Sequence, residues 1–372
     1  MTRVAIVGAG PAGAQCAYLL AKAGYDADIF EEHKTIGCPV QCTGIVTPSF
    51  EKILPVKSEF FMNKLSKVRA FAPNGSRADI NVNDLVYDRA KLDQYLINRA
   101  VDAGATIHVA HRVTRIEHHH KETDSTSTIA VRHHNETTDH TYDLLIGADG
   151  PTSTVAKSIG VLKQRFWFGV QALVEMPVER DVYNVYFGDN FPNFFGWAVP
   201  ESGNHIRIGL AAEQDSRHYF DLFMKKFGAG TIVEMQGGLI PLYNPNIKIQ
   251  EKNTYLVGDA ATHVKATTGG GIIPGMLAAQ ALAASIIENK SYKCLLKPID
   301  RELRMGLFIR NALNKFTDQD YNYIVSLLAE PKLQRLLAEH DRDNPSKIIF
   351  KALFAEPRLA LLWRTIFRTK RL

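Results

Sequence analysis

The chain has 372 residues, of which 45% are hydrophobic and 22% charged, which is ordinary for a globular protein and long enough for two domains. Its net charge of +5 is mild and argues against nucleic acid as the main partner, although it suits an anionic membrane or cofactor. Four cysteines are too few for a disulfide scaffold and favour a cytoplasmic setting. No signal peptide is expected, because the N-terminus leads directly into the first predicted strand. The sequence has no run of about 18 apolar residues, so no membrane-spanning segment is expected either.

The N-terminal segment carries the pattern of a dinucleotide-binding unit. A buried strand, a glycine-rich turn, a helix and a second strand are predicted in that order, over residues 4–7, 8–13, 14–23 and 27–30. Gly8, Gly10 and Gly13 form G-x-G-x-x-G, in which the glycines allow a tight turn, close approach to a diphosphate and close packing of helix on strand. Glu31 ends the second strand, where it would bind a ribose. The fingerprint predicts a dinucleotide site without distinguishing NAD from FAD.

Two cysteines follow in the next loop, Cys38 and Cys42, with C-x3-C spacing. A metal site would need two further ligands, and His33 is the only nearby candidate, so no metal is expected. A redox disulfide is one alternative, and the pattern favours a glycine-rich active-site loop with small thiols.

A different kind of structure is predicted after residue 48. Residues 67–72 alternate and are followed by a Pro-Asn-Gly turn, which indicates antiparallel sheet. A helix is then predicted over residues 90–103, ended by Gly104. Arg89 would lie in the first turn of this helix, where a cation opposes the helix dipole. The sequence leaves two alternatives for it: an anionic partner such as a cofactor phosphate, or a solvated surface position.

Residues 117–142 are polar and rich in histidine, and they predict a solvent-facing hairpin with residues 129–131 in one arm. A metal-binding tract is the alternative, but no carboxylate or thiol pattern completes a site. Residues 164–210 are again typical of strands. The aromatic stretch 192–200 predicts either sheet core or the lining of a ligand site.

Two later apolar strands each end in an acid, one at Asp149 and the other at Asp259. A helix is predicted over residues 274–287, and the three glycines at 269–271 lie just before it. Glycines at the start of a helix present backbone N–H groups to an anion or an electron-rich ring.

The C-terminal part, residues 291–372, is predicted to be helical and charged. Its last segment has apolar residues at helical spacing, at Leu359, Leu362, Trp363, Ile366 and Phe367. Basic residues are interspersed, at Arg358, Arg364, Arg368, Lys370 and Arg371. Such a helix either lies on the surface of an anionic membrane or packs on the body of the protein.

The Gly8–Gly13 turn, Asp149-Gly150 and Gly258-Asp259 together look like the signatures of FAD-dependent enzymes of the p-hydroxybenzoate hydroxylase fold. Within that group, residues 1–290 resemble the archaeal geranylgeranyl reductases of the digeranylgeranylglycerophospholipid reductase type. The motifs that carry the resemblance lie at residues 36–42, 87–89, 192–200, 258–261 and 264–272, the last being the most specific. The segment 192–200 is similar to the family's P-x-x-Y-x-W-x-F-P, with Phe195 in place of the tyrosine and Val199 in place of the phenylalanine.

The resemblance implies an α/β chain with a Rossmann-like FAD-binding domain, interrupted by an antiparallel-sheet substrate domain and followed by a C-terminal helical region. The FAD-binding domain is predicted over residues 1–50, 87–160 and 251–290. The substrate domain is predicted over residues 51–86 and 161–250, and the helical region over residues 291–372.

Site residues follow from the fingerprint, the acid-ended strands and the resemblance. The fingerprint predicts cofactor contacts at Gly8, Gly10 and Gly13, the first acid-ended strand adds Asp149, and the glycines before the later helix add Gly270. The resemblance implies that FAD is also contacted by Ala12, Glu31, Cys42, Thr43, Gly44, Arg89, Val113, Asp259, Gly271 and Ile272. It further implies that Phe195 and Trp197 line a prenyl cavity, where the missing tyrosine hydroxyl alters substrate length, head group or proton delivery.

Reduction of an isolated C=C bond needs a hydride, which side chains cannot supply and reduced FAD can. The proton would come from a protein acid or water that the sequence does not identify, and Cys42 is a candidate for positioning only. The chain has no second G-x-G-x-x-G, so the electron donor is expected to be transiently bound NADPH or a carrier such as ferredoxin. The expected partner is an isoprenoid lipid, met in the cytoplasm or at the inner face of the membrane.

Two other functions stay open from the sequence. Residues 196–200 partly resemble the W-x-W-x-I-P motif of flavin halogenases, without its first tryptophan, so a flavin-dependent monooxygenase or halogenase is the main alternative. A flavin-binding membrane protein without catalytic activity is the third.

Overall fold

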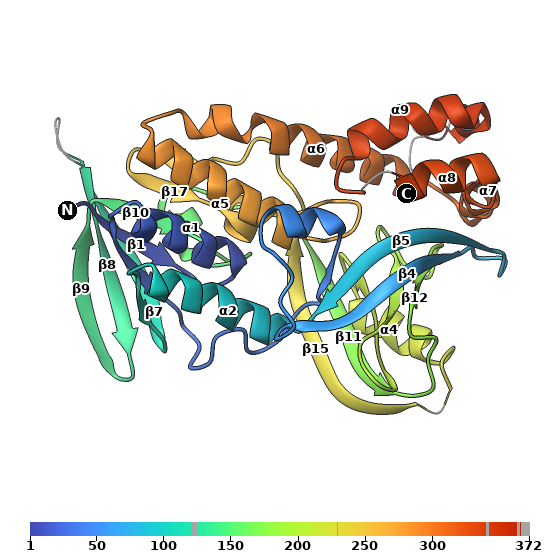
Figure 1. Cartoon of the computed structure of the whole chain (residues 1–372), viewed down its shortest axis with the longest axis horizontal. Coiled ribbons are helices and arrows are strands. Elements are labelled where there is room, and N and C mark those ends of the chain that lie inside the picture. Colours follow the sequence, from blue (N-terminus) through green and yellow to red (C-terminus); the bar gives the residue numbers. More distant parts are fainter. Residues whose placement is uncertain (121–124, 229, 340–341, 363–364, 366–372) are drawn as a thin grey trace. The chain divides into compact units, whose positions relative to one another are not determined.

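The computed structural model describes residues 1–120, 125–228, 230–339, 342–362 and 365, with only the backbone of His120. The chain divides into two compact units (Figure 1). Unit 1 comprises residues 1–40, 89–165 and 241–303, and unit 2 comprises residues 41–88, 166–240 and 304–372. Each unit has its own central sheet and its own hydrophobic core.

The central sheet of unit 1 has six strands in the order β16-β17-β10-β1-β2-β6. Their bounds are β1 Arg3–Val7, β2 Asp26–Phe30, β6 Thr106–His108, β10 Leu144–Gly147, β16 Gln250–Glu251 and β17 Thr254–Leu256. All are parallel except β16, which runs antiparallel to β17. The carboxyl ends of β17, β10, β1 and β2 therefore meet at one edge, where open α/β sheets bind their ligands.

Unit 1 has three layers. Helices α1 (Pro11–Lys22), α2 (Arg89–Asp102) and α5 (Ile272–Ile287) pack together beside the parallel sheet (Figure 1). The opposite face carries α3 (Thr154–Ser158) and a second sheet of β7 (His111–His120), β8 (Ser125–His133) and β9 (Glu136–Tyr142). The prediction of a helix from residue 14 was three residues late, because Gly10 caps α1 and Pro11 occupies its first turn, where proline is favoured.

The histidine-rich segment differs from its prediction. It forms a three-stranded antiparallel sheet rather than a hairpin, and only part of it faces solvent. Ile129 and Val131 are buried, and they pack in one core with Val7 and Leu145. Side chains alternate along a strand, so the polar residues take one face and leave these two apolar residues to cover the parallel sheet.

The central sheet of unit 2 has eight strands in the order β15-β11-β14-β13-β12-β4-β5-β3. Their bounds are β3 Ile45–Val46, β4 Phe61–Phe71, β5 Arg77–Tyr87, β11 Phe166–Glu175, β12 Val182–Tyr186, β13 Gly196–Pro200, β14 His205–Ala212 and β15 Thr231–Pro241. The β4–β5 hairpin turns at residues 72–76, which confirms the predicted antiparallel sheet. Helix α4 (Ser216–Met224) covers one face through Phe220 and Phe223.

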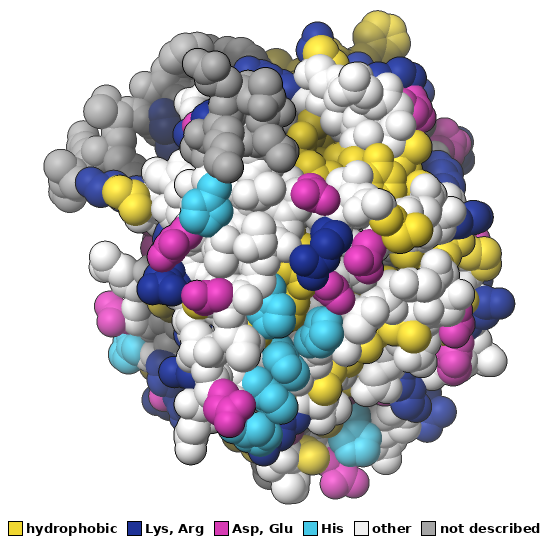
Figure 2. Space-filling model, turned by 90° about the vertical axis from the view of Figure 1, so that its left-hand side faces the viewer, with side chains coloured by type: hydrophobic (Ala, Val, Ile, Leu, Met, Phe, Trp, Pro, Cys, Tyr) yellow, Lys and Arg dark blue, Asp and Glu magenta, His cyan; other side chains and the backbone are white. Residues whose placement is uncertain are grey.

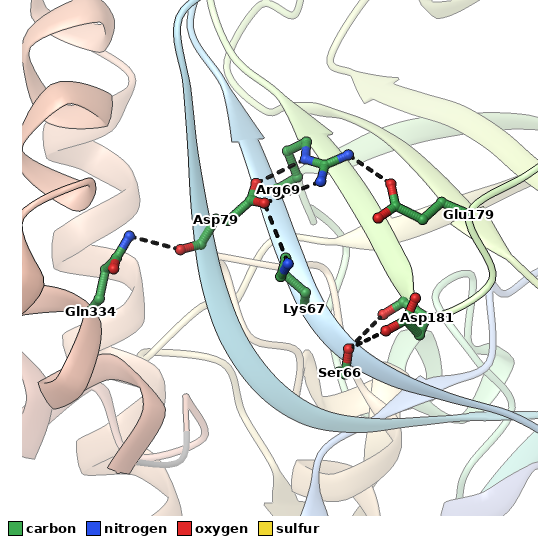
Figure 3. A network of polar contacts seen from close by, with 7 residues as sticks. All are labelled: Ser66, Lys67, Arg69, Asp79, Glu179, Asp181 and Gln334. Atoms are coloured by element: carbon green, nitrogen blue, oxygen red, sulfur yellow. Dashed lines mark hydrogen bonds and ion pairs between the residues drawn. The ribbon is translucent and has the colours of Figure 1, made fainter.

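A polar network ties the β4–β5 hairpin to the segment before β12 (Figure 3). Arg69 donates hydrogen bonds to Asp79 at 2.8 and 3.1 Å and to Glu179 at 2.8 Å. Gln334 donates a hydrogen bond to the backbone carbonyl of Asp79. Because these groups are partly exposed, the network fixes geometry more than it adds stability.

The C-terminal region is helical, as predicted. It contains α6 (Tyr292–Leu313), α7 (Asp318–Leu328), α8 (Pro331–Glu339), α9 (Pro345–Ala355) and the 3-10 helix η3 (Pro357–Leu362). In the predicted apolar stripe, Leu359 packs against a cluster that includes Leu333, and Leu362 is buried. The stripe's remaining residues, Trp363, Ile366 and Phe367, lie outside the described residues. Across the described ranges, no helix is both long and apolar enough to cross a membrane.

Candidate functional site

The first turn of unit 1 is shaped by its three glycines. Gly8 has φ of +100°, and a Cβ there would lie 2.3 Å from the carbonyl oxygen of Ala148 on the neighbouring strand end. A Cβ on Gly13 would lie 2.0 Å from the carbonyl oxygen of Gly8. Among the described residues, no atom lies within 4 Å of the Cβ position of Gly10, and no side chain caps the helix that starts there. The helix N-terminus therefore presents its N–H groups to open space, as a diphosphate site requires.

Glu31 closes the same edge of the sheet. One carboxylate oxygen accepts a hydrogen bond at 3.0 Å from the backbone N–H of Ala9, inside the glycine turn. The other accepts from the backbone N–H of His33 and contacts the His33 ring at 2.6 Å. Glu31 is thus held beside the turn, and its oxygens keep lone pairs for the hydroxyls of a ribose.

Gly258, which precedes α5, and Gly275, in the first turn of α5, pack directly on α1. A Cβ on Gly258 would lie 2.9 Å from the Cβ of Ala12, and one on Gly275 would lie 3.6 Å from the same atom. These contacts join the two halves that the sequence predicted separately, the Gly8–Gly13 turn and the glycine-led helix α5. A small residue is needed at each of these positions because helix, turn and helix meet there.

Asp259 lies against the start of α5. A Cβ on Gly271, the N-cap of that helix, would lie 2.7 Å from Asp259 Oδ1. Burial raises the pKa of the Asp259 carboxyl to about 6, and the charge of Arg89 opposes that rise. The carboxylate, the arginine and the open helix start together form a polar corner suited to the polar part of a dinucleotide.

Arg89 starts α2, in the first turn as predicted. Its guanidinium donates hydrogen bonds to both oxygens of Asp93, each at 3.0 Å. Burial raises the pKa of Asp93, and the nearby Arg89 opposes this. The structure therefore gives Arg89 an anionic partner within its own helix, and a contact with the cofactor stays a prediction.

Asp149 follows the β10 strand but is used differently. One of its oxygens accepts from the backbone N–H groups of Thr154 and Val155, at 2.6 and 3.2 Å, and the other accepts from the Ser153 hydroxyl. Ser153 in turn caps α3 by accepting from the N–H of Ala156. These contacts make Asp149 the anchor of α3, so its predicted role in cofactor binding stays a prediction.

Three further predicted contacts lie in unit 1, at Val113, Gly270 and Ile272. The side chain of Val113 packs in the hydrophobic core, so only its backbone is placed to meet a ligand. The carbonyl of Gly270 accepts a hydrogen bond from the N–H of Lys265, and Ile272 is the first residue of α5. Gly270 and Ile272 sit at or beside the N-terminus of α5, where backbone N–H groups are available.

The remaining predicted cofactor residues belong to unit 2. Gly44 has φ of +74°, and a Cβ there would lie 2.1 Å from the carbonyl oxygen of Tyr87. Its N–H donates to the sulfur of Cys42 at 3.4 Å, with Thr43 at the tip of that turn. All four cysteines are free thiols, Cys38 and Cys42 among them. The loop is held tightly against β5, and its contact with FAD stays a prediction.

The structure brings Phe195 and Trp197 together at the start of β13. Their rings lie 6.0 Å apart at 66°, and Phe195 stacks on Phe194 at 4.4 Å. Phe195 and Trp197 are half-buried, whereas Phe194 is buried. The aromatic stretch therefore supplies both core and an accessible apolar surface.

Sequence reasoning missed a buried polar cluster on the same sheet. Gln171, Arg207 and Gln236 lie in three different strands and are each at most 7% exposed. The available signal was the presence of long polar residues inside otherwise apolar strands. His263 was also missed. It is 1% exposed, and burial lowers its pKa to about 4.

The histidines of the β7–β9 region gather on one face of unit 1 (Figure 2). The His111 and His133 rings stack with centroids 4.1 Å apart, and His134 lies 4.3 Å from His133. Within the part of the chain that the structure describes, no group of three or more His, Cys, Asp or Glu side chains could hold a metal ion. Stacking of the rings on one another accounts for the clustering of these histidines without a metal ion.

A parallel sheet whose edge carries a glycine turn, an acid after the second strand and a second glycine-led helix is typical of dinucleotide-binding proteins of the α/β class. The chain belongs to the FAD binding domain family, whose model matches residues 1–220. The family confirms FAD as the cofactor and settles the choice between NAD and FAD that the fingerprint left open.

Relatives agree with the resemblance predicted from the sequence. Digeranylgeranylglycerophospholipid reductase of Methanococcus vannielii is 29% identical over 311 residues, which is 78% of each chain. A geranylgeranyl bacteriochlorophyll reductase-like structure from Thermoplasma acidophilum has a TM-score of 0.84 and 22% identity, and the match covers 99% of this chain and 100% of that one. A flavin-dependent brominase structure has a TM-score of 0.70 and 15% identity, covering 96% and 100%. At these identities the structural likeness shows the fold alone.

Proposed function

We propose that this protein is an FAD-dependent reductase that saturates C=C bonds in the geranylgeranyl chains of archaeal-type membrane lipids or their precursors. The observation that carries the proposal is the relative named as such a reductase, which is similar over 78% of both chains. The half-buried pair Phe195 and Trp197 supports it, because an isoprenoid chain needs an apolar, aromatic surface.

Each group of residues has a part in this reaction. Gly8, Gly10 and Gly13 bind the diphosphate at the start of α1, and Glu31 orients the ribose. FAD, when bound and reduced, supplies the hydride that no side chain can provide. Phe195 and Trp197 hold the chain and exclude water from the reacting bond.

The test is an anaerobic assay with chemically reduced protein and a geranylgeranyl lipid, read by mass spectrometry. The expected product gains the mass of two hydrogen atoms for each bond reduced. Unchanged lipid, with FAD bound and reduced, would refute the proposal. Oxygen consumption with a product that carries one added oxygen or halogen would establish the monooxygenase or halogenase alternative instead.

The electron donor forms part of the same proposal. The sequence holds a single G-x-G-x-x-G, which we propose binds FAD, so the donor is expected to bind transiently. NADPH and reduced ferredoxin are the two candidates, and the rate of flavin bleaching under anaerobic conditions distinguishes them. Bleaching by NADPH alone identifies a nucleotide donor, and bleaching only by ferredoxin identifies a carrier protein.

A peripheral contact with the membrane completes the proposal, and α9 is the element that supports it. Phe350 and Phe354 are 68% and 91% exposed, and Lys347 and Lys351 lie on the same side of the helix at i, i+3, i+4 and i+7 spacing. Exposed aromatic rings interleaved with cations fit the boundary of an anionic bilayer. This surface replaces the more C-terminal stripe of the sequence prediction, whose described part is packed on the protein.

Co-sedimentation with vesicles tests the membrane contact. Binding is expected to anionic vesicles and to fall at least about tenfold in the double variant Phe350→Ser, Phe354→Ser. Leu162→Ser is a matched control, because Leu162 is 80% exposed in unit 1. Equal binding by both variants would refute a role for α9.

A further inference from the structure

The strands of unit 2 place two side chains beside Gly209 on one face of the sheet. Gly209 of β14 pairs with Gln171 of β11 on one side and with Trp197 of β13 on the other. A Cβ on Gly209 would lie 2.6 Å from the Cβ of Gln171 and 2.7 Å from the Trp197 ring. Because Gly209 has no side chain, the indole N–H of Trp197 reaches across it and donates to Gln171 Oε1 at 3.2 Å.

The hydrogen bonds continue from Gln171 into a buried ion pair. Gln171 Nε2 donates to Gln236 Oε1 at 2.7 Å, and Arg207 Nη1 donates to the same oxygen at 2.7 Å. Arg207 also donates through Nε and Nη2 to Glu201 Oε1, at 3.0 and 2.8 Å. These four residues are all more than nine-tenths buried. Burying an ion pair and two amides is costly unless every polar group in the cluster is hydrogen-bonded.

One donor of the cluster lacks an acceptor. Gln236 Oε1 accepts two N–H groups, so the orientation of the amide is fixed. Gln236 Nε2 is buried and finds no hydrogen-bond acceptor among the described residues. Buried amide N–H groups are nearly always paired, so an unpaired one points to a ligand that carries an acceptor.

The cluster lies near both predicted features of the site in unit 2. Trp197, assigned to the prenyl chain, is bonded to it directly. Gly238 lies two residues after Gln236 on the same face of β15, and a Cβ on it would lie 3.3 Å from the Cβ of Gln41. Gln41 precedes Cys42, so the Cys42 loop rests on this face as well.

We propose that Gln236 Nε2 donates a hydrogen bond to the oxygen at the polar end of the isoprenoid substrate. Gln171 and the Arg207–Glu201 pair act through Gln236 and Trp197 as positioning residues. The inference rests on the proposed function and deepens it. An apolar surface alone does not fix a hydrocarbon chain along its length, whereas one hydrogen bond sets which double bond lies at the reacting position.

The test compares geranylgeraniol, a geranylgeranyl ether lipid and the matching tetraene hydrocarbon without oxygen. With the wild-type holoenzyme, we expect kcat/KM for the two oxygenated compounds to exceed that for the hydrocarbon by at least about tenfold. Gln236→Leu is expected to remove this preference and keep activity on the hydrocarbon. Gln236→Glu keeps a similar shape but replaces the N–H donor with an acceptor, so it is also expected to lose the preference.

Controls separate this role from simple stability. Arg69→Gln breaks the network of Figure 3 in the same unit and is expected to leave the oxygen preference unchanged. Equal kcat/KM for all three substrates in the wild type would refute the inference while leaving the proposed function standing. The inference would also fail if Gln236→Leu lowered kcat/KM for all three substrates equally. That result would indicate that Gln236 Nε2 binds a water molecule and not the oxygen of the substrate.

Binding provides a readout that does not need turnover. Quenching of tryptophan fluorescence reports affinity for geranylgeraniol and for the hydrocarbon. If neither compound is reduced, the proposed function fails, yet a preference for the alcohol that Gln236→Leu abolishes would still support the inference. The absence of any binding preference in the wild type would overturn it.

Discussion

His263 is predicted to give the protein a pH-dependent stability that one substitution removes. The side chain is 1% exposed, follows the Gly258–Ala261 turn, and has a buried Nδ1 without a hydrogen-bond partner among the described residues. Burial lowers its pKa to about 4. Folding therefore disfavours the protonated imidazole, because burial removes its charge from water.

The sign and size of this pH dependence of stability follow from the linkage between protonation and folding. A histidine in the unfolded chain has a pKa of about 6.5, so protons bind the unfolded state first as the pH falls. The stabilising contribution is complete above that value and is lost as the pH falls toward about 4. Between pH 7.5 and pH 5, the free energy of unfolding should fall by about 2 kcal/mol because of this residue alone.

Urea denaturation of the apoprotein, followed by circular dichroism across this pH range, measures the effect. The quantity of interest is the difference between wild type and His263→Gln at each pH, because contributions from other groups cancel. His218→Gln is the matched control, since His218 is exposed on α4. A wild-type-minus-variant difference that stays constant between pH 7.5 and pH 5 would refute the reasoning.

Two glycine substitutions test the proposed FAD site, and a third substitution tests the anchor of α3. Gly13→Ala places a Cβ 2.0 Å from the Gly8 carbonyl oxygen, so we expect FAD affinity to fall by about tenfold or more, measured by flavin retained on dialysis. Asp149→Asn weakens the acceptor that anchors α3 and should lower the free energy of unfolding by about 1–2 kcal/mol, measured by urea denaturation. Gly271→Ala places a Cβ 2.7 Å from Asp259 Oδ1, and we expect weaker FAD binding in a flavin fluorescence titration. Unchanged FAD binding in either glycine variant, or unchanged stability in Asp149→Asn, would contradict the corresponding contact.

Local rules account for what the sequence predicted well. The G-x-G-x-x-G turn, the β4–β5 hairpin and the glycine-ended α2 each depend on a few neighbouring residues with restricted backbone angles. The polar cluster around Gln236 could not be predicted from the sequence, because it combines side chains from four segments. Their register relative to one another is set only when the sheet folds. The burial of Ile129 was missed for a related reason, since the parallel sheet that it covers is formed by other segments.

Asp149 and Asp259 show how the same sequence signal can have two structural outcomes. Both follow parallel strands that are neighbours in the sheet, β10 and β17, and the sequence assigned both to the cofactor. After Asp149 a helix begins within five residues, and its first N–H groups occupy the carboxylate. After Asp259 a turn and a glycine loop delay the next helix until Ile272, so the carboxylate meets the start of α5 through Gly271 instead. In these two cases the distance from the strand end to the next helix decides whether the acid anchors that helix, as Asp149 does, or lies beside the start of α5, as Asp259 does.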